Sequence, residues 1–137
     1  MNKGTIFSGL LLVVCGCALT VVAQNGAAPA FKPAASVDAL MHGQQDQFKT
    51  INELVNNKAA KDRGKNIGVA AELLAELANV NSFNKDKADY QAWARDLRDT
   101  SLALSKDARK PDAKDEDLKK TVERMKAICK ACHDVYQ

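Results

Sequence analysis

Apolar side chains recur every three to four residues along most of the chain after position 36, with polar and charged residues between them. This spacing is typical of helices that bury one face, and no strand-like alternation is evident. The pattern predicts four helices, the first over about 37–58 and the second over about 67–79. We expect the third to end before Pro111 and the fourth to reach Tyr136.

Short polar segments mark where these helices begin. Ser36 is a good N-cap for the first helix, with Asp38 in its first turn. Asp86 or Asp89 suits the start of the third helix, and the acids of 112–115 suit the start of the fourth. We expect segment 59–66 to form the first connection. Residues 79–86 form a polar turn whose two apolar residues, Val80 and Phe83, are predicted to fold back onto the core.

Each predicted helix has one apolar face. The faces comprise Val37, Leu40, Met41, Phe48, Ile51, Leu54 and Val55; Ala70, Leu73, Leu74, Leu77 and Ala78; Tyr90, Trp93, Leu97 and Leu104; and Leu118, Val122, Met125, Ile128, Cys129, Cys132 and Tyr136. Four such helices with short connections predict an all-α fold, an antiparallel four-helix bundle. Large apolar residues are few, which suggests that something besides side chains fills the centre.

The first 23 residues have the form of an export signal. Lys3 provides a positive start, Ile6–Val14 is almost unbroken apolar sequence, and small residues follow up to Ala23. We expect cleavage after Ala23 and a periplasmic location. A competing hypothesis is lipid anchoring through Cys17, because segment 14–17 loosely resembles a lipoprotein processing site. Residues 24–35 form an Ala/Pro tether, and 36–137 form the domain.

Composition adds mainly exclusions. A chain of 137 residues with 46% hydrophobic and 27% charged residues suits one folded domain and not a disordered chain. Without residues 1–23 it has 19 basic and 17 acidic side chains, a net charge of +2. This near balance gives no case for nucleic-acid binding, and no transmembrane span is expected in the mature chain.

The strongest chemical signal lies at the end of the chain. Residues 129–133 read Cys-Lys-Ala-Cys-His, the C-x-x-C-H pattern of covalent haem c attachment. Two thiols one helical turn apart can each form a thioether to one vinyl group of the same haem. The adjacent imidazole of His133 then reaches the iron as its axial ligand. Export agrees with this interpretation, and the sequence predicts one haem c on Cys129 and Cys132.

Two other kinds of site were weighed against haem. A thioredoxin-like redox pair or a disulfide would also use Cys129 and Cys132, but redox pairs usually begin a helix that follows a strand. Structural zinc needs four ligands. The mature chain offers only Cys129, Cys132, His133 and His42 as soft or nitrogen donors.

With these motifs, the chain resembles the class II cytochromes c, the cytochrome c′ group and its low-spin relatives. This family is an exported four-helix bundle with C-x-x-C-H near its C-terminus, and the resemblance covers about residues 36–137. The stretch Cys-His-Asp-Val-Tyr at 132–136 is similar to the family's ending. The resemblance implies covalent attachment at Cys129 and Cys132, axial ligation by His133 and a dimer as one oligomeric state.

The second axial position decides the function that the resemblance implies. In low-spin members a Met of the first helix completes the iron, and Met41 stands at that position. Helical spacing independently places Met41 on the apolar stripe with Phe48 and Val55. His42, about 100° around the helix, falls on the polar face. We therefore expect Met41, rather than His42, to be the sixth ligand.

The basic residues depart from the family pattern in two places. Val37 stands where many members have a basic residue near a haem propionate, and Gln137 stands where many have Arg or Lys. The candidate replacements are Lys58, Lys61, Arg63 and Arg95. Another basic group, on the predicted haem-bearing helix, is a hypothetical docking face for an acidic redox partner protein. It comprises Lys119, Lys120, Lys126 and Lys130.

Three functions remain open on the sequence alone. The preferred one is an electron carrier with His133 and Met41 as iron ligands, which transforms no substrate and is not an enzyme. The alternative is a five-coordinate cytochrome c′ that binds nitric oxide or carbon monoxide, with Met41 only packing over the iron. A haem-dependent catalyst would need acid–base groups above the iron, and the first helix offers only His42 or Gln44.

Overall fold

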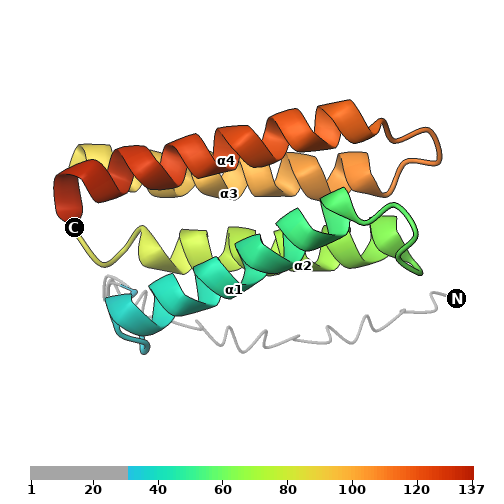
Figure 1. The fold of residues 1–137 in the computed structure, drawn as a ribbon. Coiled ribbons are helices and arrows are strands. Elements are labelled where there is room, and N and C mark those ends of the chain that lie inside the picture. The colour runs from blue at the N-terminus through green and yellow to red at the C-terminus, as the bar shows by residue number, and fades with distance from the viewer. Residues whose placement is uncertain (1–30) are drawn as a thin grey trace, which may run out of the picture.

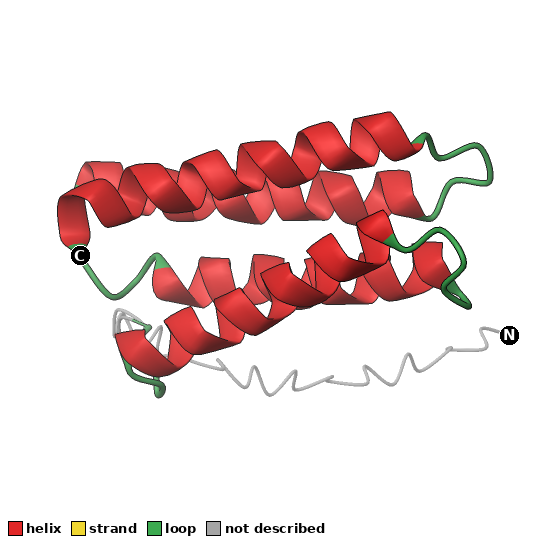
Figure 2. Cartoon of the chain, viewed as in Figure 1, coloured by secondary structure: helices red, strands yellow, loops and turns green. Residues whose placement is uncertain are grey.

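The computed structural model of the protein describes residues 31–137. The predictions about Cys17, cleavage after Ala23 and most of the tether concern residues outside that range. Within it, the helices are α1 (Val37–Asn56), α2 (Arg63–Asn81), α3 (Ala88–Ala108) and α4 (Asp115–Tyr136). They run side by side, each antiparallel to the next along the chain, and residues 31–137 contain no strand (Figures 1 and 2). The predicted all-α four-helix bundle is confirmed.

Most predicted helix ends agree with the structure. Ser36 caps α1, because its hydroxyl accepts a hydrogen bond from the Ala39 backbone N–H at 3.2 Å. Helix α3 ends at Ala108, just before the segment that leads to Pro111. Helix α4 begins at Asp115, with two further acids in its first turn.

The start of α2 was predicted wrongly. The helix begins at Arg63, so the first connection ends at Asp62 and not at 66. Asp62 has a left-handed backbone with φ 52°, a conformation that short polar residues tolerate. This residue turns the chain directly into the helix, as the hydrogen bond from Asn66 N–H to the Asp62 carbonyl at 2.9 Å shows.

The core combines large apolar side chains from α1 and α4 with small ones from α2. Its buried members are Ile51, Val55, Ile67, Ala70, Ala71, Leu74, Ala78, Leu97, Leu104, Ala108, Leu118, Val122, Met125 and Ile128. Alanines on α2 let α3 approach closely. At Gly64 an added Cβ would collide with the Ala108 carbonyl oxygen, so this glycine is required by the contact.

Three apolar residues predicted to be buried are exposed. Leu73 of α2 is 51% exposed and Phe83 of the α2–α3 connection is 53% exposed. Phe83 instead contacts Phe31, with ring centroids 4.8 Å apart in an edge-on arrangement. Val37 is also exposed, because it begins α1 beyond the point where the helices pack. The spacing of apolar residues predicts which face of a helix is buried, but it does not predict how far the neighbouring helices extend along that face.

The bundle has two dissimilar ends. At the closed end, where α1 ends and α4 begins, Asp115 of α4 pairs with Lys58 and with Arg63, the latter at 2.9 Å. Arg63 also donates to the Leu54 and Val55 carbonyls, each at 2.7 Å, and so joins α1 to α2. The opposite, open end is where α1 begins and α4 ends (Figure 1).

Candidate functional site

Three adjoining spaces lie between the helices at the open end, and Met41 and His133 line all three. The outer spaces have volumes of about 460 Å³ and about 270 Å³. The inner one, about 30 Å³, extends into the bundle between them. Its other walls are Gln44, Ala78, Asn81, Tyr90, Trp93, Ala94, Leu97, Ile128, Cys129 and Cys132. Ligand cavities of a few hundred Å³ are typical of cofactor sites.

The last turns of α4 present the C-x-x-C-H motif to these spaces. Cys129 and Cys132 are three residues apart on one helix, so their side chains lie on the same side of it. Both are half-buried free thiols. Cys129 borders the inner and the larger outer space, Cys132 borders the inner and the smaller one, and His133 reaches all three. The motif therefore lies along the cavity wall.

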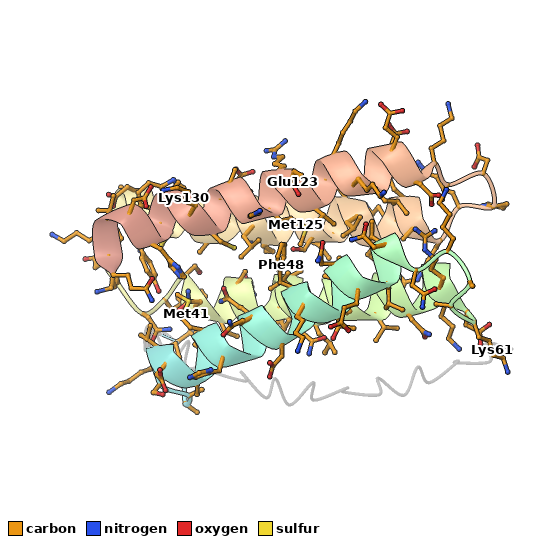
Figure 3. All side chains as sticks on the ribbon, viewed as in Figure 1. Met41, Phe48, Lys61, Glu123, Met125 and Lys130 are labelled. Carbon is orange, nitrogen blue, oxygen red and sulfur yellow. The ribbon has the colours of Figure 1, made fainter. Side chains whose placement is uncertain are left out.

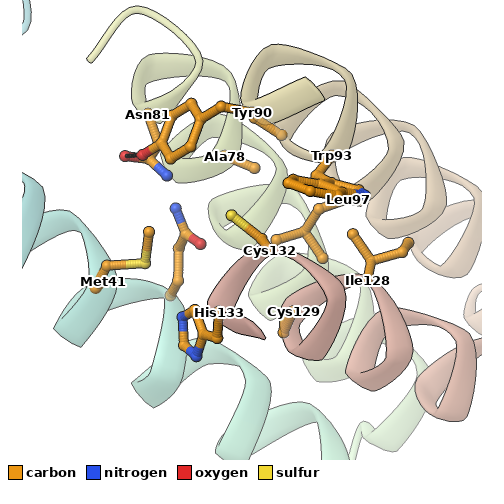
Figure 4. Close-up of a pocket in the computed structure, with 12 residues that line it drawn as sticks. Met41, Ala78, Asn81, Tyr90, Trp93, Leu97, Ile128, Cys129, Cys132 and His133 are labelled. Atoms are coloured by element: carbon orange, nitrogen blue, oxygen red, sulfur yellow. Dashed lines mark hydrogen bonds between the residues drawn. The ribbon is translucent and has the colours of Figure 1, made fainter. Parts of the chain in front are cut away.

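Met41 faces the motif from α1, and Figure 4 shows Met41 and His133 across one space from each other. Met41 is half-buried, and Phe48, two turns later, packs against the core. His42 points toward solvent, with its side chain 73% exposed and its Nε2 3.7 Å from Asp38. It reaches only the rim of the largest space. The structure thus brings Met41, and not His42, to the centre of the three cavities.

The thiols differ from those of a thioredoxin-like pair. Burial raises the pKa of Cys129 above its ordinary value, and the nearby Cys132 adds to this effect. Burial raises the pKa of Cys132 as well, assisted by Asp89 and opposed by Lys85. Reactive redox cysteines have a lowered pKa, usually at a helix N-terminus. Here the pair lies near the C-terminus of α4.

The polar side chains around the inner space are already hydrogen-bonded to protein. Gln44 donates to the Leu77 carbonyl at 3.3 Å, and Tyr90 donates to the Asn81 side-chain oxygen at 2.8 Å. Desolvation raises the pKa of Tyr90. Gln44, Tyr90 and Asn81 are therefore already engaged within the protein. This arrangement disfavours the catalytic hypothesis based on Gln44.

An aromatic cluster secures the end of α4, and the sequence pattern did not reveal it. The Tyr136 hydroxyl donates to Asp89 of α3 at 2.7 Å, and Asp89 raises the pKa of Tyr136 to about 12. The Tyr136 ring meets Tyr90 and Trp93 edge-on, with centroids 5.3 Å and 6.1 Å away. These contacts hold the last turn of α4 against α3, beside the cysteines.

The candidate replacement cations are not at this site. Figure 3 shows Lys61 at the end of the bundle away from Met41. Lys58 and Arg63 form the Asp115 ion pairs of the closed end. Arg95 is exposed on α3, near Asp99. None of the four lines the three spaces around Met41 and His133.

The predicted basic docking face is partly neutralised within its own helix. Lys130 binds Asp134 one turn away at 2.6 Å, and Lys120 binds Glu116 at 3.0 Å. Lys119 and Lys126 are exposed. The four lysines therefore present less positive charge to a partner than their number suggests.

Among residues 31–137 no group of three or more His, Cys, Asp or Glu side chains is arranged to hold a metal ion, a finding that concerns zinc-type sites. None of the helices in this part of the chain is both long and apolar enough to cross a membrane. Comparisons with protein-family models, with curated proteins and with solved structures find no match for this chain.

Proposed function

We propose that this protein is an exported monohaem c-type cytochrome that carries electrons in the periplasm between partner proteins. One observation carries the proposal. Met41 and His133, 92 positions apart in the numbering, line the same three spaces, and the two thiols of the C-x-x-C-H motif border them. The resemblance to class II cytochromes c supports the same conclusion from the residues alone.

The donor set fits a haem c. Cys129 and Cys132 are free and half-buried along the cavity wall, as two thioether bonds to one cofactor require. His133 would provide a nitrogen ligand to the iron, and Met41 a sulfur ligand. Bound haem c supplies a one-electron iron couple. The sulfur of a methionine ligand favours ferrous iron and so raises the reduction potential of the haem.

The chain's other residues support that role by forming apolar walls around the inner space. Ala78, Leu97 and Ile128 are buried apolar walls of the inner space. Trp93 and Tyr90 add flat aromatic surface, which suits contact with a planar cofactor. Apolar walls lower the local dielectric on the inner side of the site. The five-coordinate alternative would need Met41 to pack without ligating.

Absorption spectra of the purified ferric and ferrous protein test the proposal. We expect covalent haem, low-spin ferrous peaks and a far-red sulfur-to-iron band in the ferric state. Met41→Ala should lose that band, whereas Met125→Ala should keep it, because Met125 lies fully buried in the core away from the three spaces. High-spin spectra that shift with carbon monoxide would contradict electron transfer and favour gas binding.

Attachment has its own test. In the double variant Cys129→Ser with Cys132→Ser, acid–acetone should extract any haem that remains. A preparation of this variant that retains haem after extraction would show that the two thiols do not hold the cofactor. The matched control is the pair Ser101→Ala with Ser105→Ala, two buried sites on α3, which should keep covalent haem.

A further inference from the structure

A haem c carries two propionate carboxylates, and the proposed function therefore brings two negative charges to the open end. A carboxylate that is partly withdrawn from water is stabilised by a nearby cation. The four basic residues considered above cannot serve, since none of them lines the cavities at Met41 and His133. They are Lys58, Lys61, Arg63 and Arg95.

Most other Lys and Arg side chains that form ion pairs bind carboxylates away from these three spaces. Arg109 binds Glu72 at 2.6 Å on the α2–α3 face, and Arg124 binds Asp96 at 2.7 Å on the α3–α4 face. Lys130 is paired with Asp134 on the outer surface of α4. Arg109 and Arg124 thus link neighbouring helices, whereas Lys130 is paired within α4, and none of the three borders the three spaces.

Lys85 differs from all of them in position. It lies in the connection between α2 and α3, is half-buried, and lines the space of about 270 Å³ together with Met41, Cys132 and His133. It is the one Lys or Arg that lines any of these three spaces in the part of the chain described. None of the ion pairs formed within residues 31–137 includes it.

Two aromatic rings hold the Lys85 ammonium in this position. Its Nζ lies 5.2 Å from the centroid of the Tyr136 ring and 6.0 Å from that of Tyr90. Both distances are within the range of cation–π attraction. Tyr136 is itself fixed by its hydrogen bond to Asp89. The ammonium is thereby directed to the cavity that contains the proposed iron ligands, with its own hydrogen-bond donors available.

We infer that Lys85, in the α2–α3 connection, binds a propionate carboxylate of the haem. This inference rests on the proposed function. A lysine suits the task because its ammonium is a compact charge with three donors. A positive charge close to the haem disfavours the ferric state, so Lys85 would raise the reduction potential.

Titration of the ferric and ferrous holoprotein by potentiometry tests this assignment. Lys85→Gln should lower the reduction potential, Lys85→Glu should lower it further, and Lys85→Arg should preserve it. Removing the cation raises the pKa of a carboxyl beside it. The fall in potential that accompanies propionate ionisation should therefore occur at a higher pH in Lys85→Gln than in the native protein.

Other titratable groups surround the same space and must be distinguished from the propionate. They are Asp38 of α1, Asp89 and Tyr90 of α3, and Cys132, His133 and Tyr136 of α4. Repeating the titration in Asp38→Asn separates the exposed carboxylate of α1 from the propionate. If Asp38→Asn abolishes the pH shift caused by Lys85→Gln, Lys85 acts on Asp38 and the inference is wrong.

Matched controls come from Lys87, an exposed lysine two residues further on. Lys87→Gln and Lys87→Glu make the same charge changes but should leave the pH profile unchanged. Equal shifts at both positions would show that Lys85 acts only through its charge at long range, which would overturn the inference. Covalent haem content is measured in every variant. A native protein without covalent haem would contradict the proposed function. Full haem content, together with Lys85 variants that keep the native reduction potential and pH profile, would contradict only the inference.

Discussion

The closed and open ends of the bundle are built from the same four helices but differ in how the gap between α1 and α4 is filled. At the closed end, Asp115 joins two cations from the α1–α2 region, and Arg63 also binds the last carbonyls of α1. At the open end, Met41 and His133 face each other across cavities. The difference shows that protein contacts complete one end, while space remains between α1 and α4 at the other.

A second contrast lies between pairs of helices. Helices α2 and α3 approach closely enough that Gly64 leaves no room for a Cβ, and the Arg109 guanidinium covers Gly68. Helices α1 and α4 instead present long side chains with space between them at the open end. The α2–α3 pair is thus the more closely packed half of the bundle.

The largest expected effect separates core from site. Met125→Ala should lower the free energy of unfolding by about 2–5 kcal/mol, because it empties a fully buried position. It should leave the absorption spectrum unchanged. Met41→Ala should show the reverse pattern, a changed spectrum with a smaller stability loss, since Met41 is only half-buried. Urea unfolding and spectra of both variants make the comparison. A spectral change in Met125→Ala would break the distinction between the two regions.

The same glycine-to-alanine change should have opposite signs at the two ends. Gly64→Ala should destabilise by about 1–3 kcal/mol, because the new methyl group collides with backbone of α3. Gly43→Ala in α1 should stabilise by about 0.5–1 kcal/mol through helix propensity. Its Cβ would lie 3.2 Å from Leu77 Cδ1, the end of a half-buried side chain that can move. Thermal unfolding of both variants gives the sign. A destabilised Gly43→Ala would mean that the open end is packed as tightly as the closed end.

Acid should weaken the closed end through Asp115. Lys58, and then Arg63, hold the pKa of the Asp115 carboxyl below its ordinary value. The ion pairs therefore stabilise the fold above that ordinary pKa, and the contribution is lost as the pH falls through the lowered one. Asp115→Asn should lower the urea midpoint at pH 7, with the difference from the native protein shrinking in strong acid.

Asp117→Asn is the control for Asp115, because it removes a carboxylate from the same first turn of α4 without removing either ion pair. Its effect on the urea midpoint should be smaller, because only the favourable interaction of the carboxylate with the helix dipole is lost. Equal losses in the two variants would assign the effect to the helix terminus rather than to the link between α1, α2 and α4.

The smallest expected effect concerns the last turn of α4. Tyr136→Phe removes the hydrogen bond to Asp89, so backbone amides near Cys132 and His133 should exchange faster with solvent. Because Asp89 raises the pKa of Tyr136 to about 12, this bond stabilises below the ordinary tyrosine pKa and is lost as the pH rises through 12. Hydrogen exchange checks the prediction. Val135→Ala, an exposed neighbour, is the control. Equal exchange in both variants would leave Tyr136 without an anchoring role.

Much of the fold was readable from the sequence, for identifiable reasons. The Ser36 cap, the stop before Pro111 and the acidic start of α4 are local signals, and all three agree with the structure. The start of α2 was missed because the left-handed turn at Asp62 has no strong sequence mark. Leu73 was misplaced because its spacing suits a buried face, although no neighbouring helix covers that position.

For the site, the sequence by itself determined the chemistry that its residues can offer. The spacing of Cys129, Cys132 and His133 is local, since one helical turn sets it. Helical periodicity also separated Met41 from His42, and the structure keeps that separation. Neither conclusion requires knowing where α1 lies relative to α4.

Only the tertiary structure decided which distant residues share the open end. It brings Lys85, Asp89 and Tyr136 together from three segments, and it puts Lys58 and Arg63 at the opposite end. By charge alone, Lys58 and Arg63 were two of the four candidates in the sequence, and Lys85 was not among them. The physical reason is that helical spacing specifies on which side of its own helix a side chain lies. Which helix ends lie together depends instead on how whole helices pack.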